Sequence, residues 1–330
     1  MLRSETAAKP ERMQQALKGL RAYQEAERAL PPEPMPVVAE LHGARLRNYG
    51  GDGAPLLVIP SLINPPNVLD LEAQQSLLRW LARRGHHVLL LDWGDDSLGR
   101  RDMTVADHVR QVIVPMMSEV GAPPLLLGYC LGGTMAVAAA ALAPARAVAT
   151  IAAPWHFAAY PRKALKMMAD VWAAAQPSVG ALGVLPMEAL QSAFWNLDPA
   201  RTIGKFEAFA EMPSGSPEAQ AFVRLEDWAN DGPPISAAAA REMFEDFFAQ
   251  DLTGQTQWRV GGRAIDPTAL ACPQLHVAST TDRIVPHGTA IRSGDQIALA
   301  QGHVGMVVGS RARAALWEPL SAWLSLQPAS

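Results

Sequence analysis

The residues best suited to chemistry surround Cys130, in the segment Gly-Tyr-Cys-Leu-Gly-Gly at positions 128–133. Leucines precede this segment and an alanine-rich stretch follows it, so it joins a predicted buried strand to a predicted helix. A G-x-nucleophile-x-G turn in that context is a nucleophile elbow, which presents its central side chain at a helix N-terminus. The partial positive charge there favours a thiolate. We therefore predict that Cys130 is a catalytic nucleophile, although a small buried packing residue is the simpler explanation for an isolated cysteine.

An acid and a base for this nucleophile are expected further along the chain, in that order. Asp282 comes just after a predicted strand at 274–278, and His303 follows a short predicted strand near 297–298. Both therefore fall on loops at the same sheet edge as the elbow. His303 would take the proton of the thiol, and Asp282 would hold the imidazole in the required tautomer.

Other residues compete for these roles. His287 lies near the predicted acid but precedes the last strand, and His156 follows the fourth strand, where it fits the mouth of a pocket. Asp295 is the rival acid, but it opens a strand instead of following one. Cys272, beside a proline, is most simply a packing residue. Position along the chain favours Cys130, His303 and Asp282 over each of these competitors.

Two backbone amides are predicted to form an oxyanion hole. The N–H of Leu131 directly follows the nucleophile, at the start of the predicted helix. The second donor is expected from the loop at 60–64, after the first buried strand, because this loop contributes an N–H in folds with such an elbow. We predict Leu62 for this donor, with Ile63 as the alternative.

The alternation of predicted elements indicates an α/β fold with a mostly parallel sheet. Short apolar runs ended by turn residues are typical of strands buried on both faces. Segments of helical spacing separate them. The predicted strands are 56–59, 88–91, 125–127, 148–153, 274–278 and 295–298, and the helices of the core are 71–84, 104–120, 134–142 and 312–324.

The same pattern divides the chain into four parts. Residues 1–36 form an N-terminal arm, helical over 11–30, which we expect at the surface. Residues 37–155 and 271–330 form the two parts of an α/β-hydrolase core. Between them, residues 156–270 lose the alternation and are predicted to form a helical cap, with helices at 161–175, 186–194 and 235–248.

Composition excludes several functions. The 330 residues are 49% hydrophobic and carry a net charge of −4 without a basic stripe, which argues against nucleic-acid binding. We expect no signal peptide and no transmembrane segment. Two cysteines without disulfide spacing fit a reducing compartment, so we expect a cytoplasmic protein. No metal cluster, phosphate loop or dinucleotide fingerprint stands in a convincing context, so we expect no bound cofactor.

Several of these segments together resemble the polyhydroxyalkanoate synthases, in the order of that family and from about residue 37 onward. The matching segments are the elbow at 128–134, Leu-Ile-Asn at 62–64 with Val-Leu-Asp-Leu at 68–71, Leu-Asp-Trp-Gly at 91–94, Gly-Gly-Arg at 261–263, Asp-Arg-Ile-Val-Pro at 282–286 and Gly-His-Val-Gly at 302–305. The resemblance implies an acyltransferase that polymerises 3-hydroxyacyl-CoA. Cys130 would carry the growing chain, with His303 as base and Asp282 as orienting acid.

The resemblance also implies partners. The chain length is nearer to that of the short catalytic subunits of the family, which implies a second synthase subunit or a homodimer, and a place at the surface of polyester granules. CoA thioester would be the substrate and not a cofactor. Leu131 stands where those subunits tend to have glutamine, and Pro65 stands after Asn64 where the family usually has an aromatic residue.

Two other functions remain open on the sequence. The dienelactone hydrolases share the same elbow, so a cysteine hydrolase of esters, thioesters or polyesters is the alternative. Those enzymes are shorter and lack a large helical insertion. A granule-associated protein without activity is the third reading, and acylation of Cys130 would distinguish it from either enzyme.

Overall fold

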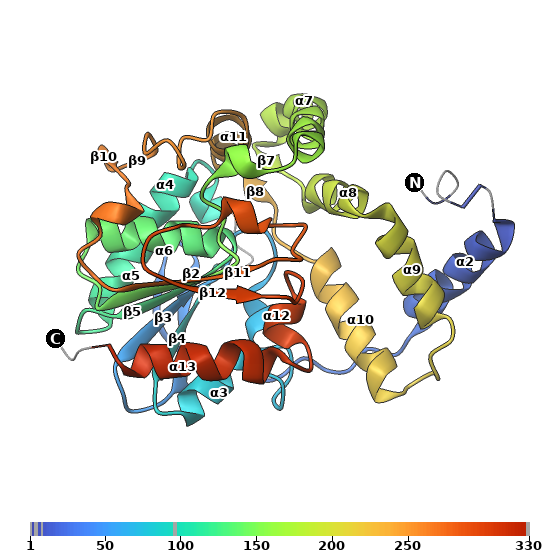
Figure 1. Ribbon diagram of the computed structural model, residues 1–330, viewed down its shortest axis with the longest axis horizontal. Coiled ribbons are helices and arrows are strands. Elements are labelled where there is room, and N and C mark those ends of the chain that lie inside the picture. The colour runs from blue at the N-terminus through green and yellow to red at the C-terminus, as the bar shows by residue number, and fades with distance from the viewer. Residues whose placement is uncertain (1, 3–5, 8, 95–97, 328–330) are drawn as a thin grey trace.

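An eight-stranded sheet forms the centre of the computed structural model, which describes residues 2, 6–7, 9–94 and 98–327 (Figure 1). The strand order is β1-β2-β4-β3-β5-β6-β11-β12. The strands from β4 to β12 are parallel, whereas β2 runs antiparallel to both of its neighbours. The strands are β1 (Val37–Leu41), β2 (Ala44–Gly50), β3 (Pro55–Ile59), β4 (His87–Asp92), β5 (Leu125–Tyr129), β6 (Ala147–Ile151), β11 (Gln274–Ser279) and β12 (Asp295–Leu299).

Side chains of the central strands alternate between two hydrophobic cores. Leu57 and Ile59 of β3 belong to one core, and Leu56 and Val58 belong to the other. The parallel strands are covered on both faces, and this explains why they are apolar throughout and not only at every second residue. All of β3 after Pro55 is buried, as are β5, β6 and β11. The apolar runs therefore predicted these strands correctly.

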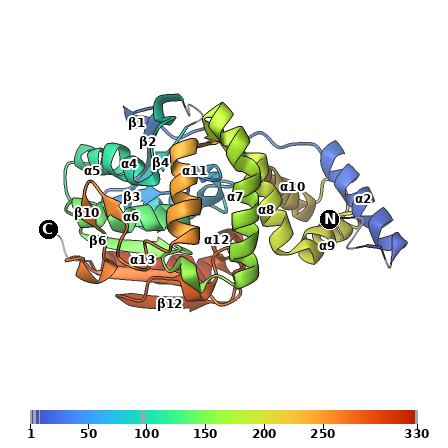
Figure 2. The same cartoon turned by 90° about the horizontal axis from the view of Figure 1, so that it is seen from above.

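Helices cover both faces of the sheet (Figures 1 and 2). On one face lie α4 (Val105–His108), the π-helical turn 109–113 that continues it, α5 (Val114–Glu119) and α6 (Leu131–Leu142). The other face is covered by α3 (Leu77–Arg83), α12 (Gly305–Val308), the π-helical turn 313–317 and α13 (Glu318–Ser325).

A long helical excursion separates β6 from β11. It contains α7 (Arg162–Leu182), α8 (Met187–Leu197), α9 (Pro199–Phe209), α10 (Pro217–Asn230) and α11 (Ala237–Arg241), which continues as a π-helical turn to Ala249. We call residues 187–230, which contain α8, α9 and α10, the outer lobe. The chain enters and leaves this lobe through a two-residue antiparallel pair, β7 (Val184–Leu185) with β8 (Ile235–Ser236).

The α/β core with a helical excursion confirms the predicted fold class. The exact division at residues 36, 155 and 270 stays a prediction. Further short strands, β9 (Arg259–Val260) and β10 (Arg263–Ala264), lie in the last part of the excursion.

Helix boundaries differ from the prediction where caps and turns decide them. The helix predicted over 71–84 begins only at Leu77, because Ser76 caps it by accepting a hydrogen bond from the Arg79 amide at 3.0 Å. The helix after the elbow begins at Leu131 and not at Thr134. In the excursion, α7 extends beyond the predicted 161–175 and ends at Leu182, where Gly183 in the left-handed region caps it.

Three larger features were not predicted. The edge hairpin β1–β2 falls where the sequence analysis placed no strand, and α9 and α10 fall on residues that it treated as undefined parts of the insertion. The N-terminal helix, α2 (Pro10–Glu25), is at the surface as expected, and its packing along α9 was not predicted (Figure 2).

Candidate active site

The predicted elbow joins β5 to α6, and Cys130 lies at its apex. Cys130 has φ of 55° and ψ of −129°, in a region that side-chain-bearing residues rarely adopt. Leu131 opens α6, and the first N–H groups of a helix have no partner within it. The thiol of Cys130 therefore stands at a helix N-terminus, where unpaired amides and the helix dipole favour negative charge.

Three glycines permit this turn because backbone segments meet there without room for a Cβ atom. A Cβ atom on Gly132 would lie 2.1 Å from the carbonyl oxygen of Ile59, in the strand beside β5. A Cβ atom on Gly128 would lie 2.3 Å from the Cα atom of Gly133. The glycines of the motif thus bring α6 directly against the loop that follows β3.

His303 and Asp282 meet in the buried space beside the elbow. His303 Nδ1 lies 2.6 Å from Asp282 Oδ2, and both side chains are almost fully buried. The other carboxylate oxygen of Asp282 accepts hydrogen bonds from the amides of Ile284 and Val285, at 2.8 and 3.1 Å. These contacts fix the carboxylate, which in turn orients the imidazole so that its second nitrogen faces the Cys130 thiol.

The electrostatic surroundings of His303 favour its protonated form. Burial lowers the pKa of His303, but the charges of Asp282 and Cys130, and hydrogen bonds to both, raise it from 6.5 to about 10. A proton taken from the Cys130 thiol is therefore held on the imidazole. The structure brings together the three residues predicted as nucleophile, base and acid, in an arrangement that can generate a thiolate.

The predicted second oxyanion donor lies in the loop after β3. Leu62 is buried, and within the described residues its amide has no hydrogen-bond partner. The amide of Ile63 donates to Ser61 Oγ at 3.2 Å, so it is already engaged. The geometry favours Leu62 over Ile63, and the oxyanion role of Leu62 and Leu131 stays a prediction.

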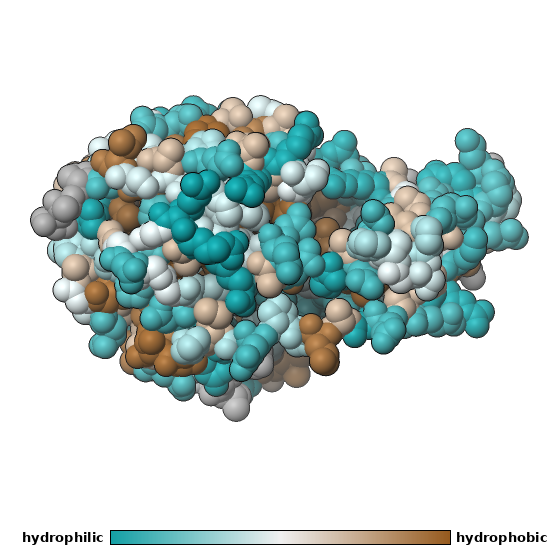
Figure 3. Space-filling model, turned by 90° about the horizontal axis from the view of Figure 1, so that it is seen from below, coloured by the Kyte–Doolittle hydropathy of each residue, from teal (hydrophilic) through white to brown (hydrophobic). Residues whose placement is uncertain are grey.

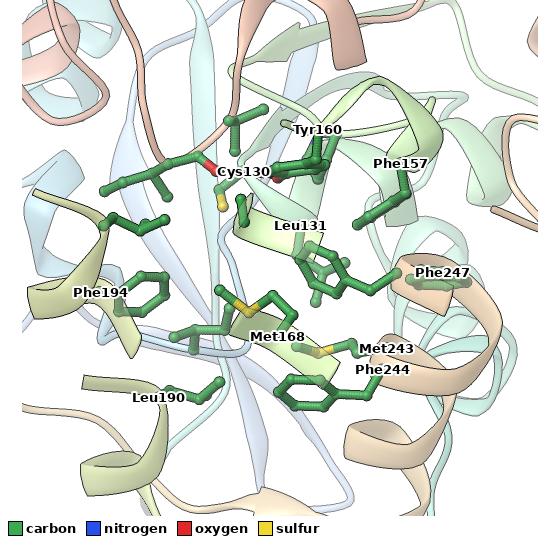
Figure 4. Close-up of a pocket in the computed structure, with 17 residues that line it drawn as sticks. Cys130, Leu131, Phe157, Tyr160, Met168, Leu190, Phe194, Met243, Phe244 and Phe247 are labelled. Carbon is green, nitrogen blue, oxygen red and sulfur yellow. Dashed lines mark hydrogen bonds between the residues drawn. The ribbon is translucent and has the colours of Figure 1, made fainter. Parts of the chain in front are cut away.

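Two cavities of different character meet at Cys130. The first is almost wholly apolar and lies under the cap (Figure 4), where the sulfur of Cys130 faces a ring of aromatic, methionine and leucine side chains. It is lined, among others, by Leu131, Phe157, Tyr160, Ala164, Met168, Leu190, Phe194, Met243, Phe244 and Phe247. The hydroxyl of Tyr160 is turned aside and donates to the carbonyl of Ile284 at 3.1 Å.

The second cavity is more polar and opens on the side of His303. Its polar lining consists of Ser61, Asn64, Gln191, Thr202, Lys205 and His303. Phe194, together with Ile63 and Ile284, lines both cavities. Helix α8 therefore forms a partition, with Leu190 and Leu197 on the apolar side and Gln191 and Trp195 on the polar side.

The family of the chain follows from a comparison with protein-family models. Residues 68–317 match the model of the alpha/beta hydrolase family, which is more than half of the chain. The chain belongs to the alpha/beta hydrolase family. The match includes the elbow, Asp282 and His303.

Curated relatives are similar to this chain over most of its length. It is 28% identical to the poly(3-hydroxyalkanoate) polymerase subunit PhaC of Haloferax mediterranei, over 92% of this chain and 66% of that protein. It is 26% identical to the protein of the same name from Allochromatium vinosum, over 82% of this chain and 80% of the relative. The chain thus spans about two thirds of the length of the haloarchaeal relatives.

Solved structures agree on the fold. A thermophilic esterase from Thermogutta terrifontis superposes with a TM-score of 0.52 at 16% identity, covering 90% of this chain and 98% of the esterase. At that identity the likeness describes the α/β-hydrolase architecture alone.

The rival residues do not line the two cavities at Cys130. His287 is exposed in a single helical turn after the Asp282 loop. Asp295 is exposed at the start of β12, where it accepts a hydrogen bond from the indole of Trp323 at 2.7 Å. His156 is half-buried, and the linings of the two cavities at Cys130 do not include it.

Sequence reasoning missed most of the residues that line the cavities. Phe244, Phe247 and Phe248 come from one turn of the excursion, whereas Met168 and Phe194 come from two other helices. Their density in the segment Met-Phe-Glu-Asp-Phe-Phe at 243–248 is the one signal that could have indicated a pocket wall. Tyr129 was also missed, and its ring lies 5.2 Å from that of His303.

Neither a metal site nor a membrane span is found in the described part of the chain. Residues of the kinds that ligate metals do not gather there in groups of three or more. Of the described helices, none is both long enough and apolar enough to cross a bilayer.

The elbow geometry predicts that Gly132→Ala strongly destabilises the fold. The new methyl group would meet the Ile59 carbonyl, so we expect the free energy of unfolding to fall by about 2–3 kcal/mol. Gly180→Ala is a matched control, because Gly180 lies in α7 with open space around its Cβ position. There we expect a gain of about 0.5 kcal/mol. Urea denaturation of both variants measures the difference, and equal effects would contradict this account of the elbow.

The raised pKa of His303 predicts a pH-dependent stability. Because the folded pKa of about 10 exceeds the ordinary 6.5, protonated His303 stabilises the fold fully below pH 6.5. This contribution is lost as the pH rises through 10. Asp282→Asn removes a charge that raises this pKa, so its free energy of unfolding should fall less steeply between pH 6.5 and 10. Urea denaturation across that range tests this, and parallel curves for both proteins would refute it.

Proposed function

We propose that this protein is an acyltransferase that polymerises 3-hydroxyacyl-CoA into polyhydroxyalkanoate and releases CoA. The observation that carries the proposal is a cysteine thiol at the elbow beside a buried His303–Asp282 pair, in a chain similar to proteins named poly(3-hydroxyalkanoate) polymerase. Transfer of an acyl group from CoA to a thiol exchanges one thioester for another, so the acyl group stays activated. A serine ester would be less reactive toward the next hydroxyl.

In the first step His303 takes the proton of Cys130, and the thiolate attacks the thioester carbonyl. The amides of Leu131 and Leu62 would hold the oxyanion until the C–S bond to CoA breaks. The CoA thiolate then leaves with the proton from His303.

In the second step the hydroxyl of another 3-hydroxyacyl-CoA gives its proton to His303 and attacks the Cys130 thioester. An ester bond forms, the bond to the cysteine sulfur breaks, and the lengthened chain is carried by CoA. Repeating the first step returns this chain to Cys130 and releases CoA. Each cycle adds one hydroxyacyl unit through the same three residues.

The two cavities fit the two parts of such a substrate. The apolar cavity suits an acyl or polyester chain, since its lining offers little to a charged or hydrated group. The polar cavity, with Asn64, Gln191, Thr202 and Lys205, suits the amides and hydroxyl of a pantetheine arm. Elongation must also prevail over hydrolysis, and the cap above Cys130 limits the access of water.

We propose that the protein works with either a second synthase subunit or a second copy of itself, because the relatives are named as subunits. Its place would be the cytoplasm, at the surface of the polyester that it makes. CoA would enter as part of the substrate, and we propose no bound cofactor.

The proposed reaction predicts turnover of a 3-hydroxyacyl-CoA. With 3-hydroxybutyryl-CoA, the purified protein should release CoA and form polyester, with an acyl group on Cys130 detectable by mass spectrometry. Cys130→Ala should lower the rate by at least about 10³-fold, as expected for loss of a nucleophile. Release of monomeric 3-hydroxybutyrate instead would identify a cysteine hydrolase, and unimpaired turnover by Cys130→Ala would reject the nucleophile.

Matched substitutions separate the roles of the two cavities. Ala164 lines only the apolar cavity and Ala229 only the polar one. Ala164→Phe should slow acylation of Cys130 by p-nitrophenyl hexanoate about tenfold relative to the acetate, because overpacking excludes the longer chain. Ala229→Phe should leave that ratio unchanged but weaken inhibition by free CoA.

Both variants are assayed for ester acylation and for inhibition by CoA, so each substitution is measured on both properties. If the two variants behave alike, the assignment of acyl chain and carrier arm to separate cavities is wrong.

A further inference from the structure

Helix α2 lies on the outer side of the lobe, far along the chain from the helices that it contacts. It packs along α9, and its C-terminal end reaches α10 (Figures 1 and 2). Figure 3 shows this end of the molecule as a narrow, largely hydrophilic projection from the α/β body.

The lobe has a small hydrophobic core that α2 completes. Phe209, Ala219 and Val223 form this core, separate from the two cores on the sheet, and Tyr23 of α2 packs against it. The ring of Tyr23 lies 5.9 Å from that of Phe206 on α9 and 6.4 Å from that of Phe222 on α10. A core of this size buries little apolar surface, so the contribution from α2 is a substantial part of it.

Close packing and ion pairs fix the position of α2. A Cβ atom on Gly19 would lie 1.8 Å from the carbonyl oxygen of Phe206, so the two helices touch backbone to backbone. Arg12 binds Glu207 through two hydrogen bonds, at 2.7 and 2.9 Å. These contacts set both the distance between α2 and α9 and their register.

A chain of hydrogen bonds leads from α2 to the polar cavity beside Cys130. The hydroxyl of Tyr23 donates a hydrogen bond to Asp227 at 2.7 Å. It accepts one from the side-chain amide of Asn230 at 3.5 Å. The side-chain oxygen of Asn230 accepts a hydrogen bond from Gln191, which lines the polar cavity.

The helices that α2 holds carry much of the cavity wall. Thr202 and Lys205 belong to α9, and Trp228 and Ala229 belong to α10. On its inner side the lobe is joined to the core by the hydrogen bond from Trp228 to the Pro65 carbonyl, at 2.8 Å. The ion pair of Arg224 with Glu72, also at 2.8 Å, adds a second connection.

We propose that α2 positions the outer lobe, with Tyr23 as a positioning residue, so that the polar cavity is already formed when the carrier arm of a CoA thioester enters. The assignment of that cavity to the carrier arm rests on the proposed function. Without α2, binding would have to order α9 and α10 at an entropic cost, which raises KM and leaves the chemistry at Cys130 intact.

The test compares Gly19→Leu with Gly180→Leu in the full chain. The first variant forces α2 away from the Phe206 carbonyl, whereas Gly180 has open space. Hydrogen exchange of residues 187–230 should accelerate in Gly19→Leu alone. Its KM for 3-hydroxybutyryl-CoA should rise about tenfold, within the usual range of coupling between sites. Acylation of Cys130 by p-nitrophenyl acetate, which lacks the carrier arm, should stay within about twofold.

Tyr23→Phe tests the polar link alone, because it keeps the ring and removes the hydroxyl. A smaller rise in KM with unchanged kcat is the expected result. Unchanged exchange in Gly19→Leu would overturn the structural role of α2, and faster exchange with unchanged KM would overturn its effect on the cavity. If the unaltered protein does not react with the thioester, the proposed function fails, and the exchange comparison still decides whether α2 holds the lobe.

Discussion

The close approach of α6 to the loop after β3 is the constraint on which the site depends. Gly132 allows the first turn of the helix to touch the Ile59 carbonyl, and this contact sets the position of three things at once. It places the thiol of Cys130 above the sheet, the amide of Leu131 beside it, and the loop containing Leu62 opposite. The strained backbone of Cys130 persists because the close packing of β5, α6 and the loop after β3 holds it in place.

The sheet and the excursion contribute different parts of the site. Parallel strands bring the ends of β5, β11 and β12 to one edge, so residues distant in sequence reach one point without any special feature in the loops. The sheet supplies the thiol, carboxylate and imidazole in this way. The excursion supplies what lies above them, and α8 separates an apolar space from a polar one with a single helix.

The sequence allowed the buried parts to be predicted better than the exposed ones. Strands such as β5 read as uninterrupted apolar runs because both faces are covered, and Asp282 and His303 followed from the order of loops at one edge. The hairpin β1–β2 was not predicted because charged residues such as Arg45 and Arg47 interrupt its apolar pattern. Pairing between its two strands stabilises it instead. Helices α9 and α10 were not predicted because α2 buries part of their apolar side chains. No local sequence pattern indicates that contact. The cavities are surfaces shared by distant helices and could not be read from any one segment.

The neck formed by β7 and β8 has a consequence for how such a protein can diversify. Val184 pairs with Ser236 and Leu185 with Ile235, so the chain leaves the body and returns to it at almost the same place. The stretch between these two points can therefore change in length while its two ends stay where they are. The thiol, carboxylate and imidazole lie outside this stretch, whereas Gln191, Thr202 and Lys205 of the polar cavity lie inside it. A lineage can alter this wall of the polar cavity by insertion or replacement and leave those three residues in place.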